Sequence, residues 1–198
     1  MDNNISLSGA RVGWALCGSF CTLEPAVSAL ERFAAATGAE MMPIMSDITY
    51  NTTTRFGTAD YWRARVSKAC GGAKILTSVY ETEPIGPKKL LDLMVIAPCT
   101  SNTLAKMALG ICDSAVLMAA KAHLRNERPL VIALATNDAL SASAANIGAL
   151  LCRRNVYFVP LGQDDPSGKP RSCIADFTKV EETVAAAMEG KQVQPIIF

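Results

Sequence analysis

The chain has 198 residues and a net charge of +1, and half of its residues are hydrophobic while 19% are charged. This length suits one domain with a sizeable core, and the hydrophobic content excludes intrinsic disorder. The balanced charge gives no general field for holding a nucleic-acid backbone, and no apolar run approaches the roughly 20 residues of a membrane span. We therefore expect small-molecule or protein partners, with no nucleic acid and no membrane.

The first eight residues, Met1 to Ser8, lack the cationic and apolar regions of a signal peptide, so we expect a cytoplasmic protein. In that compartment the seven cysteines are expected to be reduced thiols. Cys17 and Cys21 are close in sequence, but the chain has one histidine, His123, and no second close cysteine pair. No metal site is therefore predicted.

Short apolar runs alternate with amphipathic segments along the chain. Strands are predicted at residues 11–16, 40–45, 75–79, 91–97 (ending at Pro98), 129–135 and 156–160. Helices are predicted at residues 23–37, 59–70, 102–109, 113–125, 138–154 and 177–189, with loops at 46–56 and 162–173. This alternation predicts a single α/β domain over residues 1–198, doubly wound, with a mostly parallel six-stranded Rossmann-like sheet and helices on both faces.

Three residues are candidate helix caps. Thr22 and Asp176 precede the first and last helices as N-caps, and Gly38 stands where a left-handed C-cap belongs. The tail, residues 190–198, lies outside the alternating pattern and ends in Ile196-Ile197-Phe198. We expect this apolar end to dock onto a neighbouring copy of the chain or onto its own.

Two loops have the composition of a ligand site at the carboxyl ends of parallel strands. In the first, Cys17 to Cys21, Gly18 lets the backbone approach a ligand and Ser19 offers a hydroxyl. The second, Pro98 to Thr103, places three hydroxyls and an amide before a helix, where they can bind phosphate oxygens. The alternative is that both are only helix caps. The spacing of Gly13 and Gly18 does not match the dinucleotide fingerprint.

Residues 97–113 (APCTSNTLAKMALGICD) and 119–132 (AAKAHLRNERPLVI) resemble the signature of the flavoprotein family of homo-oligomeric flavin-containing Cys decarboxylases and flavin prenyltransferases. The resemblance extends over most of the chain. Four more segments, residues 51–57, 83–87, 136–140 and 162–166, are similar to a member from sporulating bacteria that belongs to a two-component enzyme.

The resemblance implies an FMN site and a homo-oligomer, a trimer or larger, with the flavin at an interface between copies. The positions that match the FMN-binding residues of the family are Gly18, Ser19, Ser46, Thr100, Ser101, Asn102 and Thr103. Several of them lie in the two loops selected above on physical grounds.

The chain also departs from the family pattern. Pro84 stands where the cysteine decarboxylases carry a histidine, and their Cys-Gly flap motif is absent from residues 162–173. The arginine that flavin prenyltransferases carry after the fifth strand is replaced by Ala135 or Thr136. These departures disfavour both activities.

The resemblance instead implies flavin-linked oxidation of a small cyclic dicarboxylate, with a second, dehydrogenase-like protein as partner. Two carboxylates call for basic or multiple-donor groups. The candidates are Arg55, Lys106, Asn137, Lys169 and Arg171, and the alternative for each is a solvated surface group. No catalytic residue is predicted. Two other functions stay open: a non-catalytic or regulatory partner of a nicotinamide-dependent dehydrogenase, and a related FMN-dependent decarboxylase or prenyltransferase.

Two further positions are expected to be structural. His123 lies near a predicted helix end beside Lys121 and Arg125, which favours a surface or capping role. Asp164 and Asp165 precede a proline, and such a pair forms a turn more often than a cation site.

Overall fold

The computed structural model of the protein describes residues 7–198. Residues 1–6, on which most of the signal-peptide prediction rests, lie outside the described part. Within residues 7–198, no helix is both long enough and apolar enough to cross a membrane.

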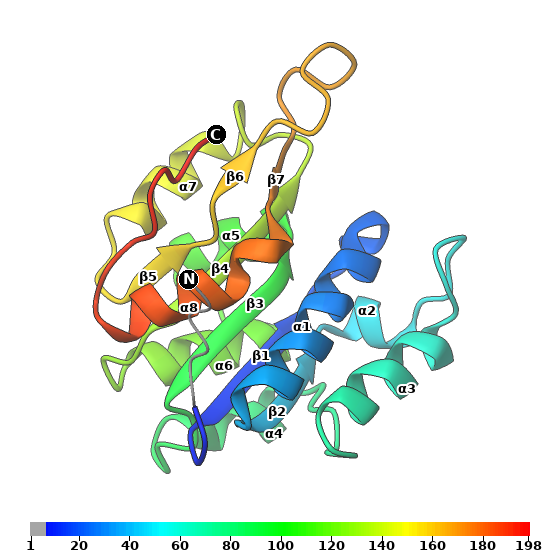
Figure 1. Ribbon diagram of the computed structural model, residues 1–198, viewed down its shortest axis with the longest axis vertical. Helices are drawn as coiled ribbons and strands as arrows, with labels where there is room; N and C mark the ends of the chain where they lie inside the picture. Colours follow the sequence, from blue (N-terminus) through cyan, green and yellow to red (C-terminus); the bar gives the residue numbers. More distant parts are fainter. Residues whose placement is uncertain (1–6) are drawn as a thin grey trace.

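A mixed sheet forms the centre of the molecule (Figure 1). Its strands are β1 (Arg11–Leu16), β2 (Glu40–Met45), β3 (Leu93–Cys99), β4 (Leu130–Thr136), β5 (Val156–Phe158), β6 (Leu161–Gly162) and β7 (Cys173–Ala175). The first five run parallel in the order β2-β1-β3-β4-β5, and β7 and β6 are antiparallel additions. The α/β class is therefore confirmed, but the described sheet has seven strands and not six.

The strand count differs for two reasons. Residues 75–79 do not form the predicted strand, and only Leu76 makes an isolated bridge to Ile44. Conversely, β6 and β7 form a hairpin around the loop that we predicted as purely irregular. β5 pairs with residues 130–132 of β4, and β7 pairs with residues 135–136, so the hairpin completes an edge that β5 leaves open. Strands of two and three residues are too short to produce a periodic pattern.

β3 does not end at Pro98 as predicted but continues to Cys99, with a shift of register between Ile96 and Cys99. Proline lacks an N–H group, and such a residue is tolerated in a strand where the ladder is irregular. The extension brings the next turn, which begins at Thr100, to the very end of the strand.

Helices cover both faces of the sheet (Figure 1). The hydrophobic core on one face includes residues of α1 (Leu23–Thr37), α3 (Ala59–Ala69) and α8 (Val180–Met188). The core on the other face includes residues of α5 (Ser101–Ala108), α6 (Ala115–Leu124) and α7 (Ala144–Leu151). The shorter elements are α2 (Asp47–Asn51), α4 (Val79–Thr82) and the 3-10 turns Phe20–Thr22, Glu83–Ile85 and Phe177–Lys179.

The side chains of β3 explain why the sequence of a central strand is apolar at every position. Leu93 and Val95 belong to the core beneath α1 and α8, whereas Met94 and Ile96 belong to the core beneath α6. Every residue of β3 is buried, as in parallel sheets covered on both sides.

Two helix predictions need correction. Residues 46–56 include α2 and are not entirely a loop, and α7 begins at Ala144 rather than near Asp138. Residues 138–143 instead form turns, in which the N–H groups of Ser141 and Ser143 donate to the Asp138 carbonyl.

The predicted caps are confirmed in part. Gly38 has a φ of 65° and ends α1 in the left-handed conformation. Asp176 accepts a hydrogen bond from the N–H of Thr178 and so begins the short turn that leads into α8. Thr22 does not cap α1 with its side chain, because its hydroxyl donates to Ser19 at 2.9 Å.

The C-terminal tail docks onto its own chain. The Leu161 N–H donates to the Ile196 carbonyl at 2.9 Å, and the Phe198 N–H donates to the Leu161 carbonyl at 3.3 Å. The tail therefore runs beside β6, next to the loop of residues 163–172 that extends beyond the sheet at the top of Figure 1.

His123 is fully buried, so the predicted surface position is wrong. Its Nε2 lies 2.8 Å from the carbonyl oxygen of Pro129, which can only accept, so Nε2 carries the proton. Nδ1 is buried without a hydrogen-bond partner among residues 7–198, and burial lowers the pKa of the imidazole. The apolar residues on most sides of α6, including Ala119 and Ala120, explain why the end of this helix is covered.

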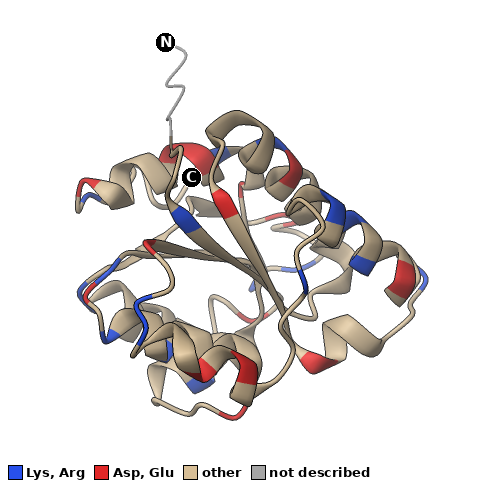
Figure 2. Cartoon of the chain, turned by 90° about the horizontal axis from the view of Figure 1, so that it is seen from below, with Lys and Arg blue, Asp and Glu red and all other residues tan. Residues whose placement is uncertain are grey.

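Charged residues of both signs are interspersed over the periphery of the molecule (Figure 2). At the amino ends of the strands, Asp92 accepts from Nε and Nη2 of Arg11, both at 3.1 Å, and from Nη1 of Arg128 at 2.8 Å. The Arg11 guanidinium lowers the pKa of the Asp92 carboxyl. This group of three residues, the amino-end cluster, therefore neutralises much of its own charge.

Candidate functional site

An open pocket of about 950 Å³ lies beyond the carboxyl ends of β1, β3 and β4. In the strand order β2-β1-β3-β4-β5 the direction of winding reverses between β1 and β3, which is where ligands bind in such sheets. The pocket is lined by Gly18, Ser19, Phe20, Cys21, Thr22, Arg55, Phe56, Thr100, Ser101, Ala135, Thr136, Asn137, Asp164, Lys169, Pro170, Arg171, Ser172 and Ile174.

The loop after β1 presents one hydroxyl with a free proton. The single hydroxyl proton of Thr22 is shared between the hydroxyl oxygen and the carbonyl oxygen of Ser19, each 2.9 Å away. The Ser19 hydroxyl accepts there and keeps its own proton for a ligand. Gly18 leaves little room for a side chain, since an added Cβ would come 3.0 Å from Cγ2 of Ile48.

The turn after β3 uses two of its hydroxyls internally. The Thr100 hydroxyl accepts from the Thr103 N–H at 3.3 Å and donates to the Thr103 hydroxyl at 3.2 Å. The Thr103 hydroxyl in turn donates to Sγ of Cys17 at 3.2 Å. Thr100 is therefore the N-cap of α5, and the Thr103 side chain is buried away from the pocket.

Ser101 is left as the hydroxyl donor of this turn, because it has no hydrogen-bond partner among the described side chains. The N–H groups of Ser101 and Asn102 belong to the first turn of α5 and have no partner within the helix. Together with the Ser19 hydroxyl, these donors at the positive end of a helix suit an anion such as phosphate.

A tight hairpin brings Arg55 and Phe56 to the pocket. Thr54 and Gly57 exchange two backbone hydrogen bonds of 3.1 and 3.2 Å, and the Arg55 guanidinium stacks 4.8 Å from the Phe56 ring centre. Gly57 has a φ of 145°, and a Cβ there would come 2.7 Å from Nε1 of Trp62. The buried Trp62 ring therefore supports the hairpin from behind.

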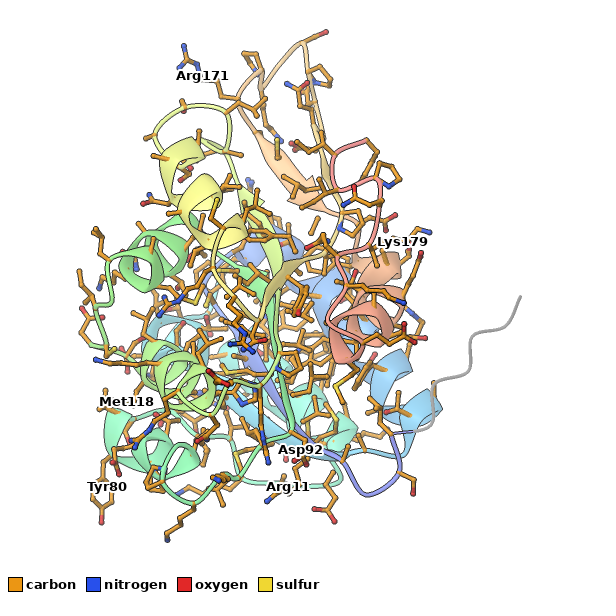
Figure 3. The ribbon with its side chains drawn as sticks, turned by 90° about the vertical axis from the view of Figure 1, so that its left-hand side faces the viewer. Arg11, Tyr80, Asp92, Met118, Arg171 and Lys179 are labelled. Carbon is orange, nitrogen blue, oxygen red and sulfur yellow. The ribbon has the colours of Figure 1, made fainter. Side chains whose placement is uncertain are left out.

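The loop between β6 and β7 contributes two more basic residues. Nζ of Lys169 lies 3.1 Å from Asp164, which raises the pKa of Lys169. Arg171 and Arg55 form no ion pair with any residue of the described part. Figure 3 shows Arg171 at one end of the molecule and the amino-end residues Arg11 and Asp92 at the other.

The end of β4 is fixed by Asp138. Its Oδ1 accepts from the Thr136 hydroxyl at 2.5 Å and from the Ser143 hydroxyl at 2.8 Å. The Ser172 hydroxyl donates to the Thr136 carbonyl at 3.3 Å and links this turn to the β6–β7 loop. Asn137 lies within the turn and lines the pocket.

The pocket brings together eight of the twelve residues selected from the sequence: Gly18, Ser19, Arg55, Thr100, Ser101, Asn137, Lys169 and Arg171. Ser46, Asn102, Thr103 and Lys106 do not line it. The Ser46 hydroxyl lies 2.7 Å from that of Thr49, and Lys106 pairs with Asp113 at 2.6 Å.

The sequence reasoning missed several lining residues, among them Phe20, Phe56 and Ser172. Phe20 and Phe56 directly follow the selected residues Ser19 and Arg55, so a wider view of those loops would have found them. Ser172 has no comparable signal, because its place depends on the β6–β7 hairpin.

Asp164 and Asp165 belong to a turn, as expected. Asp165 accepts from the Gly168 N–H at 2.8 Å through its side chain and from the Lys169 N–H at 2.7 Å through its carbonyl. Within residues 7–198, no group of three or more His, Cys, Asp or Glu side chains is arranged to hold a metal ion. All seven cysteines are free thiols.

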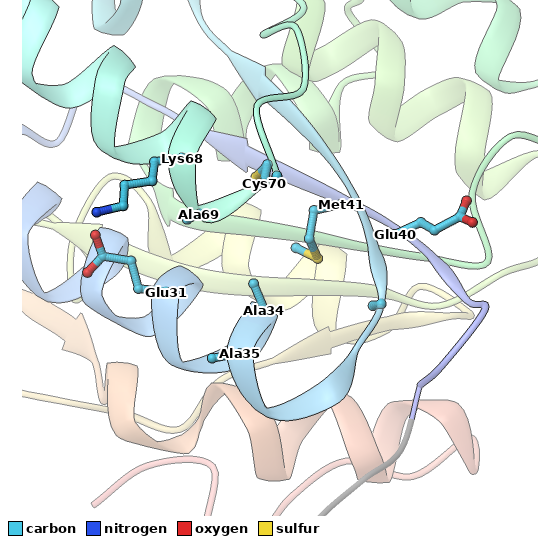
Figure 4. A pocket seen from close by; sticks show the side chains of 10 residues that line it. Glu31, Ala34, Ala35, Glu40, Met41, Lys68, Ala69 and Cys70 are labelled. Carbon is cyan, nitrogen blue, oxygen red and sulfur yellow. The ribbon is translucent and has the colours of Figure 1, made fainter.

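A second pocket of about 720 Å³ lies beside the first residues of β2, between α1 and α3 (Figure 4). Its walls are largely Ala34, Ala35, Ala69 and Met41. The carboxylate of Glu31 at its rim is bound by Arg65 at 2.7 Å. This pocket is not at the ligand-binding end of the sheet, so it is the weaker candidate.

No histidine reaches the candidate site. Pro84, at the position of the decarboxylase histidine, lies in the turn Glu83–Ile85 and does not line the pocket. His123, the one histidine of the chain, is buried beside Pro129. No imidazole of the described chain therefore lines this pocket.

Comparison with known proteins identifies relatives over nearly the whole chain. Residues 3–193 match the Flavoprotein family. The chain is 41% identical over 192 residues to the B subunit of dipicolinate synthase from Bacillus subtilis strain 168, covering 97% of this chain and 95% of the relative. The crystal structure of the B subunit of dipicolinate synthase from Bacillus halodurans C superimposes with a TM-score of 0.89 at 39% identity, covering 98% of each chain.

More distant structures share the fold. The FMN-dependent cysteine decarboxylase SpaF superimposes with a TM-score of 0.67 at 21% identity, covering 93% of this chain and 98% of its own. These comparisons confirm the resemblance inferred from residues 97–132 and the α/β fold, and they agree with the expected flavin cofactor.

Proposed function

The chain belongs to the flavoprotein family, and we propose that it is the FMN-binding component of a dipicolinate synthase, which oxidises a dihydrodipicolinate-type precursor to dipicolinate during sporulation. The observation that carries this proposal is the 41% identity to the B subunit of a dipicolinate synthase over 97% of the chain. The pocket beyond β1 and β3 supports it, since its donors and basic residues suit a phosphate and a dicarboxylate.

The donor set fits the phosphate of FMN. The Ser19 and Ser101 hydroxyls have free protons, and two N–H groups at the start of α5 add donors without adding charge. Phe20 and Phe56 supply apolar surface for an aromatic ring system. The pocket volume of about 950 Å³ is within the range for cofactor sites.

The unpaired arginines suit the two carboxylates of the substrate. A guanidinium can bind a carboxylate through two parallel hydrogen bonds, and Arg55 and Arg171 have no competing ion pair within the described chain. We assign them to the two carboxylates, with Asn137 and Lys169 as further polar contacts. Lys106 is less suited, because it is bound to Asp113.

Bound FMN supplies the capacity to accept a hydride. The residues of this chain bind and orient the substrate beside it, and the aromatic character of the product makes the oxidation favourable. No side chain of the pocket is assigned as a base. The absence of an imidazole from the pocket disfavours the alternative of a histidine-dependent decarboxylase.

Two kinds of partner complete the proposal. The first is the dehydrogenase-like A component of dipicolinate synthase, since the relatives are described as the B component of that enzyme. The second is further copies of this chain, in line with the oligomeric assemblies of the family and with the openness of the pocket to solvent. We expect the complex to act in the cytoplasm.

The test begins with the purified full chain, incubated with FMN, desalted and examined by visible absorption. Retained flavin bands are expected, and dihydrodipicolinate-type substrate should bleach them under anaerobic conditions when the dehydrogenase-like component is present. A Ser19→Ala/Ser101→Ala variant is the control for the site and should lose the bands. Flavin that is retained but never reduced would indicate a non-catalytic partner of the dehydrogenase. A wild-type complex that forms dipicolinate equally well without flavin would contradict the proposal.

A further inference from the structure

The hydrogen bond between Thr103 and Cys17 joins two loops that are far apart in sequence. Thr103 occupies a position that the family resemblance assigns to the FMN turn, yet only 6% of this residue is exposed and its hydroxyl points toward Cys17. Cys17 is 1% exposed and directly follows the last residue of β1. Neither side chain is therefore available to a ligand in the pocket.

The connection consists of side-chain and backbone bonds. Thr100 donates to the Thr103 hydroxyl, which donates to Sγ of Cys17, each bond being 3.2 Å long. The Cys17 N–H donates to the Pro98 carbonyl at 3.0 Å, just before the same turn. The end of β1 and the start of α5 are thus tied at two points.

The Cys17 sulfur acts as a neutral acceptor. Burial raises the pKa of this thiol to about 11, although the Thr103 hydroxyl works against the shift. The site below the pocket therefore holds no extra negative charge that would repel a phosphate. A thiol is a weak acceptor, so the bond is best understood as fixing geometry.

The donors for an anion are attached to the two partners of this bond. Gly18 and Ser19 directly follow Cys17, and Ser101, which also lines the pocket, lies two residues before Thr103. A single phosphate needs these donors to converge on one point, because hydrogen bonds weaken steeply when distance and angle are lost. Breaking this side-chain bond leaves only the backbone bond from Cys17 to Pro98 between the two loops, so the donors can shift relative to each other.

We propose that Cys17 is a positioning residue for phosphate binding, acting through Thr103 to hold the two donor loops in register. This inference rests on the proposed FMN site. Thr103 then supports FMN binding indirectly: its hydroxyl binds Cys17 and does not contact the cofactor.

The test is a titration of the full chain with FMN, followed by flavin fluorescence, for wild type, Cys17→Ala, Thr103→Val and the double variant. Each single variant should weaken FMN binding about 5- to 10-fold, the effect of losing one hydrogen bond that organises a site. The double variant should be no weaker than the single ones, because both remove the same bond. Additive losses would overturn the proposal.

Two controls separate positioning from packing. Cys70→Ala removes the same buried group at the end of α3, remote from the pocket, and should lower thermal stability while leaving FMN affinity unchanged. Cys17→Ser restores an acceptor and should recover part of the affinity lost in Cys17→Ala. If Cys17→Ser binds no better than Cys17→Ala, the sulfur acts by volume and the proposal fails.

The outcomes also distinguish this inference from the proposed function. If the wild-type protein retains no FMN, both the proposed function and the role of Cys17 are contradicted. Wild-type protein that binds FMN, with Cys17→Ala binding equally well but unfolding at a lower temperature, would remove this inference alone.

Discussion

The arginines at the two ends of the sheet differ in whether a carboxylate of the chain binds them. At the amino ends of the strands, Asp92 is bound by Arg11 and Arg128, and their charges are satisfied within the chain. At the carboxyl ends, Arg55 and Arg171 line a pocket without an ion pair among residues 7–198. The same fold thus uses charge for stability at one end and leaves it available for a ligand at the other. At the carboxyl ends these two arginines are the groups left free to bind an anionic ligand.

The largest expected effect comes from removing the available arginines. Arg55→Ala and Arg171→Ala should each raise the KM for the dicarboxylate about 10- to 100-fold, since hydrogen bonds to charged groups contribute about 1.5 to 3 kcal/mol. Steady-state rates of the FMN-loaded complex measure this. Arg154→Ala, an exposed arginine paired with Glu127, is the matched control and should leave KM unchanged. An unchanged KM in both pocket variants would refute their assignment to the carboxylates.

The second prediction concerns a substitution at the amino ends of the strands, away from the pocket. Asp92→Ala leaves Arg11 and Arg128 without their shared acceptor and should lower the free energy of unfolding by about 1 kcal/mol, a modest value because all three side chains are partly exposed. Denaturant titration measures it. Glu189→Ala, which removes an exposed partner of Lys191, should change nothing measurable. A loss of FMN affinity in Asp92→Ala would contradict the separation of the two ends.

Each of the two free hydroxyls of the pocket should contribute separately to FMN affinity. Ser19→Ala and Ser101→Ala are each expected to weaken FMN binding about 10-fold through the loss of one hydrogen bond to the charged phosphate. Equilibrium dialysis with FMN measures the change. Ser28→Ala, which removes a hydroxyl bound to Glu24 on α1, should bind FMN like wild type. If both pocket serines can be replaced without loss, the phosphate lies elsewhere.

The smallest effect concerns pH. The pKa of His123 is lowered in the folded protein, so the unfolded chain binds the proton more readily near pH 6. The free energy of unfolding should therefore decrease as the pH falls from about 6.5 toward the pKa of His123 in the folded protein. Above about pH 6.5, the contribution of His123 should be constant. Arg128 adds to this shift and Asp92 opposes it. Thermal unfolding of wild type and His123→Gln between these pH values tests the sign, and equal slopes would show that other groups dominate.

The parallel part of the fold could be predicted because its signals are local. The apolar run at residues 93–97 is buried on both faces, and Gly38 ends α1 with a φ of 65°. Gly18, Ser19 and Ser101 could be selected for the same reason, since the ends of parallel strands meet at one edge.

The rest depends on contacts between distant segments. The β6–β7 hairpin forms on an edge of β4 that β5 leaves unpaired, which no local pattern reveals. The inward direction of Thr103 depends on Cys17, 86 residues away in sequence. His123 is buried because α6 is covered around most of its surface, whereas the basic residues next to it indicate exposure. Lys106 forms an ion pair with Asp113 and does not reach the pocket.

The two tryptophans of the chain lie on or beneath segments that lead to the pocket, the strand β1 and the hairpin of Arg55. Trp14 is fully buried in β1, four residues or roughly 13 Å before Gly18, and Trp62 lies beneath the hairpin of Arg55. Indole emission overlaps the near-ultraviolet and blue absorption of an isoalloxazine ring. Resonance energy transfer from both indoles should therefore quench the intrinsic emission when a flavin enters, so that the protein carries its own pair of optical reporters. Replacing Trp14 or Trp62 by phenylalanine would separate the signals and locate the flavin relative to each.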